Sequence, residues 1–158
     1  MASGPRVRRT RAGDFQVRLP EPDRQLLRSL VASLREALAG DVRSQPGLRR
    51  LFPPAYIDPG DDEAETEYQA LMHDELVASR MASLEVLAAT LDRTRLDEEE
   101  LLAWMTALND LRLVLGTRLD VSEDADPVPD PDDPDAALLA IYAYVGFLLE
   151  AVVEALVP

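Results

Sequence analysis

Two arginines fall on the apolar faces of predicted helices, where a charged side chain has few partners. At helical spacing, Arg80 lies midway along a line of leucines, and Arg112 projects between Met105 and Leu119. A buried guanidinium that is not paired and hydrogen-bonded destabilises a fold. We therefore predict a polar network that fixes helix register, and the alternative is an internal arginine site that binds a small anionic molecule. The predicted network comprises Asp74, Arg80, Asn109, Asp110 and Arg112.

The remaining side chains that could act in catalysis or bind a metal form no catalytic or metal-binding pattern. His73 is the single histidine, and helical metal sites usually place a second ligand three or four residues away. Positions 69 and 77 hold Gln and Val. The chain has no Cys, which excludes a thiol nucleophile, a thiol redox switch and a zinc–thiolate site within these 158 residues. We predict a non-enzymatic protein with no catalytic residue, metal or cofactor.

The basic residues gather at the N-terminus of an otherwise acidic chain. The first 50 residues hold 11 Arg against five acids, and the other 108 hold five Arg against 25 acids. The resulting charges, +6 and −20, sum to the net charge of −14. This basic N-terminal segment, called the head below, could bind a nucleic acid, an acidic partner surface or a second copy of the chain. The alternative is an arm that only improves solubility. The candidate binding residues are Arg6, Arg8, Arg9, Arg11 and Arg18.

The same N-terminal region has a strand pattern. Phe15, Val17 and Leu19 alternate with polar residues, which is the period of a β-strand. Residues 12–14, Ala-Gly-Asp, separate this run from the arginine-rich one, so a β-hairpin is expected. We assign residues 1–20 to a basic arm or hairpin.

Four helical segments follow. The first runs from Pro22 to a stop at Gly40. The second spans residues 62–91, with a kink expected near residues 78–79 because about thirty residues is long for a globular helix. The third starts at Asp97 and is apolar around most of its circumference, so we expect it to be the central helix. Asp62 with Glu65, and Asp97 with Glu100, have the spacing of N-terminal capping boxes.

The fourth segment starts near residues 134–135 and is strongly apolar. Length alone would let it cross a membrane, but Glu150 and Glu154 are costly in hydrocarbon, so a core or dimer-interface helix is expected. An acidic, proline-rich linker, residues 120–135, precedes it. We predict a mainly α fold: one four-helix bundle-like domain over residues 21–158 with a short N-terminal β-hairpin, forming a homodimer through the fourth helix or the hairpin.

The third helical segment resembles a known family. Residues 101–119, which contain Asn-Asp-Leu-Arg at 109–112 and Leu-Gly at 115–116, are similar to the signature helix of the actinobacterial AosR-type family. Its members have a domain of unknown function and are often described as oxidative-stress transcriptional regulators. Arg49-Arg-Leu-Phe-Pro53 and Asp74-Glu-Leu76 also resemble family blocks.

The resemblance implies a small cytoplasmic protein that takes part in stress-linked transcriptional regulation. Its implied partners are a sigma factor or other transcription machinery, and a regulator that also contacts DNA is one of two open alternatives. The other is an adaptor linked to proteolysis that does not touch DNA. This chain departs from the family pattern because it has no Cys, so the thiol sensing that the family implies has no residue to act through here. No membrane contact is expected.

Overall fold

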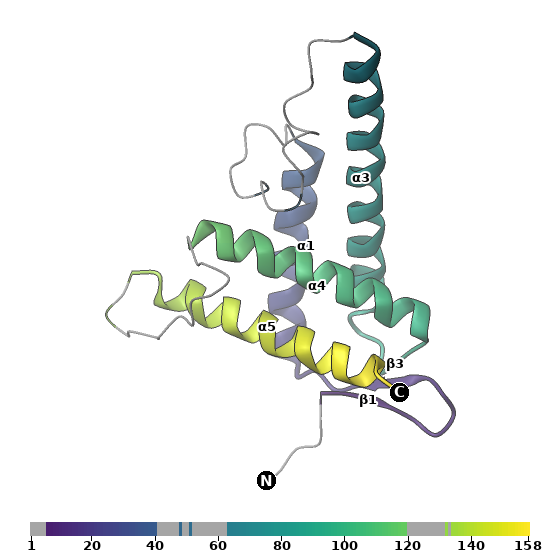
Figure 1. Ribbon diagram of the computed structural model, residues 1–158. Coiled ribbons are helices and arrows are strands. Elements are labelled where there is room, and N and C mark those ends of the chain that lie inside the picture. The colour runs from purple at the N-terminus through teal and green to yellow at the C-terminus, as the bar shows by residue number, and fades with distance from the viewer. Residues whose placement is uncertain (1–5, 41–47, 49–50, 52–62, 120–131, 133) are drawn as a thin grey trace.

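The computed structural model describes residues 6–40, 48, 51, 63–119, 132 and 134–158, and its elements lie in the order shown in Figure 1. The prediction of a mainly α fold with four long helices and an N-terminal hairpin is confirmed. The elements are β1 (Val7–Arg9), β2 (Phe15–Val17), α1 (Glu21–Ala39), α3 (Glu63–Thr90), β3 (Arg95–Leu96), α4 (Glu98–Arg118) and α5 (Ala136–Leu156).

The hairpin is part of a small antiparallel sheet with the strand order β1-β2-β3. Its turn contains Gly13, whose φ of 94° lies in the left-handed region that favours glycine. The third strand was not expected, because β3 has two residues and only Leu96 contributes to the core. Arg95 also donates to the Asp14 carboxylate at 3.1 Å. The Thr10 hydroxyl, and then Arg95, lower the pKa of Asp14 by hydrogen bonding.

The helix boundaries lie within two residues of the predicted ones. At the start of α4 the Asp97 side chain accepts from the Glu100 amide at 2.7 Å, and the Glu100 side chain accepts from the Asp97 amide at 2.9 Å. This is the expected capping box. The kink expected at residues 78–79 is absent from α3, which is one helix from Glu63 to Thr90. The second predicted box begins at Asp62, which lies outside the described residues, as does most of the linker at 120–135.

The helices form two crossing pairs (Figure 1). Helices α1 and α3 run side by side, and α4 and α5 lie together across them. Helix α4 contacts all three of the other helices, and its Leu101, Trp104 and Leu108 are completely buried. The prediction that this helix is central is therefore confirmed by its packing.

Helix α5 is much less covered than its composition would suggest. Only Val145, Leu148 and Val152 are buried along its 21 residues. Among the described helices it is the one that is long and apolar enough to cross a membrane, by length and composition alone. In the structure it packs against α4 and β1, and its outer side carries Phe147 and Val153 with 56% and 41% of their surface exposed.

Candidate interaction surface

The predicted interior network is resolved into two separate pairs. The first joins the long helices α3 and α4: Arg80 Nη1 lies 2.8 Å from Asp110 Oδ1. The Asp110 side chain is fully buried, whereas the Arg80 side chain is 25% exposed. Burial raises the pKa of Asp110 to about 6, and the charge of Arg80 opposes that rise. The arginine thus neutralises a carboxylate that lies in the core between two helices.

The second pair lies in the same turn of α4, because Asn109 and Arg112 flank Asp110 in the sequence. Arg112 Nη2 donates to Asn109 Oδ1 at 3.2 Å, and Gly146 of α5 lies beside the aliphatic part of Arg112, where an added Cβ would be 3.9 Å from Cδ. Asp74 is exposed on α3 and belongs to neither pair. The structure therefore brings together Arg80 with Asp110 and Arg112 with Asn109, and it leaves Asp74 at the surface.

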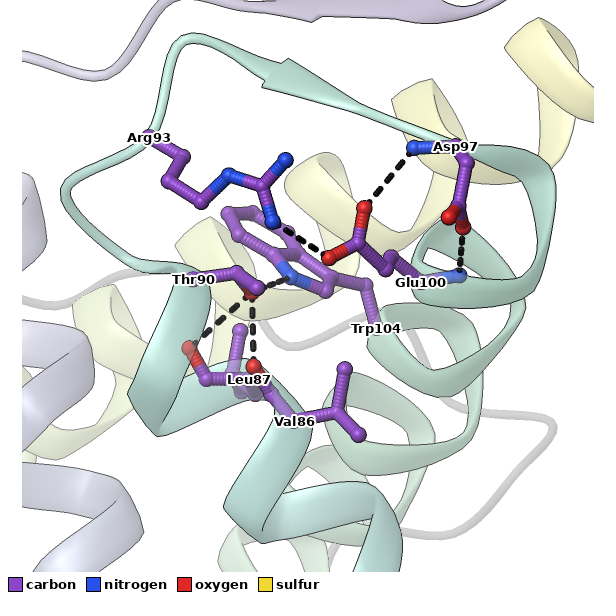
Figure 2. Close-up of polar contacts among 7 residues, drawn as sticks. All are labelled: Val86, Leu87, Thr90, Arg93, Asp97, Glu100 and Trp104. Atoms are coloured by element: carbon purple, nitrogen blue, oxygen red, sulfur yellow. Dashed lines mark hydrogen bonds and ion pairs between the residues drawn. The ribbon is translucent and has the colours of Figure 1, made fainter.

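A further polar cluster holds the corner between α3 and α4 (Figure 2). The indole Nε1 of the buried Trp104 donates to the Thr90 hydroxyl at 2.7 Å, and that hydroxyl donates to the Val86 carbonyl at 2.6 Å. Beside them, Arg93 Nη1 lies 2.5 Å from the Glu100 carboxylate that also belongs to the capping box. These bonds fix the corner between the two helices.

A hollow lies between β1 and α5. This β1–α5 groove has a volume of about 680 Å³. Arg6, Val7, Arg8 and Arg9 form one wall, and the C-terminal half of α5 forms the other. The α5 wall consists of Phe147, Glu150, Ala151, Glu154 and Ala155, and it continues into Val157 and Pro158.

Contacts within the groove tie the strand to the helix. Arg9 Nη2 donates to the Leu156 carbonyl at 3.1 Å, and the Arg9 guanidinium lies 4.9 Å from the centre of the Phe15 ring. A cation at the last turn of a helix is stabilised by the carbonyls that have no partner there. Arg8, on the opposite face of the strand, donates to Gln16 at 2.7 Å. Both arginines are exposed, and Arg9 is the one whose hydrogen bond reaches α5.

The five head arginines do not form one patch. Arg6, Arg8 and Arg9 line the β1–α5 groove, Arg11 is exposed in the hairpin turn, and Arg18 is exposed beyond β2. Arg18 and Arg6 border a second, shallower hollow of about 320 Å³. The sequence identified the basic wall of the groove but not the helix that faces it.

The residues that sequence analysis did not select are Phe147, Glu150 and Glu154. Their spacing of three and four residues places them on one face of the last helix. The helical pattern was the available signal. Nothing in the pattern indicated that this face would lie beside residues 6–9, about 140 positions away in the chain.

Comparisons with known proteins identify relatives but no structural match. A Mycobacterium leprae protein described as an oxidative stress regulator, AosR, is 30% identical over 126 residues, covering 70% of this chain and 58% of the relative. The oxidative stress regulator AosR of Mycobacterium bovis is 31% identical over 123 residues, covering 68% of this chain and 56% of the relative. The chain thus spans little more than half the length of these relatives. No solved structure matches it significantly.

The family model that matches is described as a domain of unknown function, DUF2017, and it covers residues 4–156. That range includes both walls of the β1–α5 groove and all of the described helices. With nearly the full length matched, this chain belongs to the DUF2017 family.

Proposed function

We propose that this chain is a non-enzymatic regulatory protein of the cytoplasm that acts in a stress response by binding another protein. The observation that carries the proposal is the β1–α5 groove, where apolar surface of α5 lies open beside an edge strand. Exposed apolar surface with a charged rim is typical of protein-binding sites. The link to stress rests on relatives that are named oxidative stress regulators.

The distribution of charge supports a protein partner over DNA. DNA-binding surfaces concentrate Arg and Lys where phosphates lie. Here Arg6, Arg8 and Arg9 share their groove with Glu150 and Glu154, which would repel phosphates. The net charge of −14 adds to that repulsion.

The interior arginine supports a structural role better than ligand binding. Arg112 donates to Asn109 and is not among the residues that line the β1–α5 groove. With no Cys in these 158 residues, none of them can receive a thiol signal. A sigma factor or other transcription component is the partner that fits the named relatives.

The test is complementation in the native host. A strain lacking the gene is challenged with hydrogen peroxide and supplied with the wild-type chain, Phe147→Asp or Arg11→Glu. Both substituted residues are exposed, and only Phe147 lines the groove. We expect wild type and Arg11→Glu to restore survival and Phe147→Asp to fail. Equal rescue by all three would contradict a function through the groove.

Co-purification and DNA titration distinguish the partner classes. Recovery of a polymerase subunit or sigma factor supports the transcriptional role, and recovery of a protease component alone supports an adaptor. With promoter DNA we expect weak, non-specific binding. Specific binding with a salt dependence that is flattened by removing Arg6, Arg8, Arg9 and Arg11 would instead assign the head to phosphate contact.

A further inference from the structure

Among the described strands, none pairs with the outer edge of β1. The Arg18 amide donates to the Arg6 carbonyl at 2.7 Å, and the Thr10 amide donates to the Asp14 carbonyl at 2.8 Å, so residues 6, 8 and 10 direct their main chain toward β2. Main-chain groups in an antiparallel strand alternate in direction. The amides and carbonyls of Val7 and Arg9 therefore face away from β2, on the edge side of the sheet.

The groove lies along this edge. Its strand wall comprises four consecutive residues, Arg6 to Arg9, whose side chains alternate between the two faces of the sheet. A hollow that follows the edge of a strand meets residues of both faces in this way. Across it, Phe147, Ala151 and Ala155 supply an apolar wall. We propose that the groove binds an extended segment of a partner protein, which adds a fourth strand to the sheet beside β1.

The side chains around the edge define the chemistry of that segment. Arg8 is exposed on the face opposite the core, so residues of the incoming strand on that face should be acidic. Val7 lies on the other face, which is covered by α5. Residues of the incoming strand on that face would meet Phe147 and the alanines, so they should be apolar. The expected ligand alternates acidic and apolar residues, with its carboxylates directed away from Glu150 and Glu154.

A second copy of this chain is a poorer occupant. Two β1 strands paired antiparallel through Val7 and Arg9 would place Arg8 directly opposite Arg8 of the partner subunit. Like charges at directly opposed positions destabilise a sheet. Dimerisation through the hairpin is therefore disfavoured, and dimerisation through α5 stays a prediction.

The inference rests on the proposed function only in that the ligand is a protein. Its test is a binding measurement on the purified protein and does not need the native host. The probe is a short capped peptide that alternates Glu and Val, labelled for fluorescence anisotropy. The controls are a peptide of the same composition with the Glu residues grouped together, and a peptide that alternates Arg and Val. We expect the alternating acidic peptide to bind and both controls to bind at least about fivefold more weakly.

N-methylation of the peptide tests strand pairing without altering the protein. In a β-strand, every second amide faces the neighbouring strand. Methylating the alternate amides that face β1 should weaken binding about tenfold or more. Methylating the other alternate set, which faces away from β1, should have little effect. Equal sensitivity of the two phases would overturn strand addition, because it would leave only electrostatic attraction to the arginines.

Charge reversal assigns the site. Arg8→Glu should weaken binding of the acidic peptide about fivefold or more and strengthen binding of the Arg-Val peptide, whereas Arg11→Glu should change neither. Circular dichroism and the melting temperature confirm that both variants are folded. If no peptide binds and sedimentation shows a dimer that Phe147→Asp dissociates, the groove is a self-interface and the proposal fails. Peptide binding without any peroxide phenotype would instead refute only the proposed stress function.

Discussion

Trp104 and Thr90 are joined by a 2.7 Å hydrogen bond from the indole to the hydroxyl, at the corner between the end of α3 and the start of α4. Trp104 is completely buried and Thr90 is 5% exposed, so water cannot replace either partner. The hydroxyl also donates to the Val86 carbonyl, which orients its lone pairs toward the indole. One threonine therefore satisfies the polar atom of the largest side chain in the core.

Replacing Thr90 with Val should destabilise the protein by about 1–3 kcal/mol, because the indole N–H would be buried without an acceptor. The matched control is Thr117→Val. That hydroxyl donates only to the Leu113 carbonyl of its own helix, at 2.9 Å, and its loss should cost less than about 0.5 kcal/mol. Urea unfolding followed by circular dichroism measures both values. Equal losses at the two sites would show that the indole bond contributes nothing special.

The buried carboxyl of Asp110 should make stability depend on pH. Its pKa is raised from 3.8 to about 6, so the folded state binds its proton more tightly than the unfolded state. Stability from this group is therefore greatest below pH 4 and declines as the pH rises from about 4 to about 6. Over that window the wild type should lose about 2–3 kcal/mol relative to Asp110→Asn, whose side chain does not titrate. A constant difference between the two proteins across this range would exclude a raised pKa.

Removing Arg80, the partner of Asp110, should lower the free energy of unfolding more than removing an arginine at the surface. Arg80→Met leaves a buried carboxylate without its cation, and we expect a loss of about 2–4 kcal/mol at pH 7, moderated by the partial exposure of Arg80. Arg35→Met is the control, since the Arg35–Glu85 pair between α1 and α3 is separated by 2.7 Å but both side chains are about half exposed. Its removal should cost less than about 1 kcal/mol. Comparable losses in thermal unfolding would contradict this ranking.

Two glycines should respond in opposite directions to the same substitution. Gly13 has a φ of 94° with open space around it, so Gly13→Ala should destabilise the hairpin by about 1–2 kcal/mol through backbone strain alone. Gly146 lies inside α5, where an added Cβ would make an ordinary 3.9 Å contact with Arg112. Gly146→Ala should therefore stabilise by about 0.5–1 kcal/mol. Melting temperatures that shift in the same direction would refute one of the two assignments.

Much of the fold was accessible from local patterns. The capping box at Asp97 and Glu100 and the alternation of Phe15 and Val17 each depend on a few neighbouring residues, and both predicted their elements correctly. Strand β3 was missed because two residues carry too little pattern to distinguish a strand from a turn. The expected kink in α3 rested on length alone, and a long helix packed against α1 and α4 has no need to bend.

Only part of the candidate site could be predicted from the sequence, because its residues come from distant segments. Helical projection placed Arg80 and Arg112 inside apolar arcs, but it could not decide which acids reach them, since Asp110 lies thirty residues from Arg80. Asp74 is an acid six residues before Arg80, but its position on the exposed side of α3 removes it from that cluster. The groove forms where β1 packs beside α5, and a local hydrophobic period does not predict contacts between segments so far apart in the chain.

The bond from Arg9 to the Leu156 carbonyl joins positions 147 residues apart, and this has a consequence for biosynthesis. On the ribosome, β1 emerges before α5, the helix that covers its inner face, has been translated. Throughout elongation the Val7 side of the sheet stays uncovered, and unprotected strand edges promote aggregation. Nascent chains stalled before residue 136 should therefore depend on chaperones more than the finished protein does.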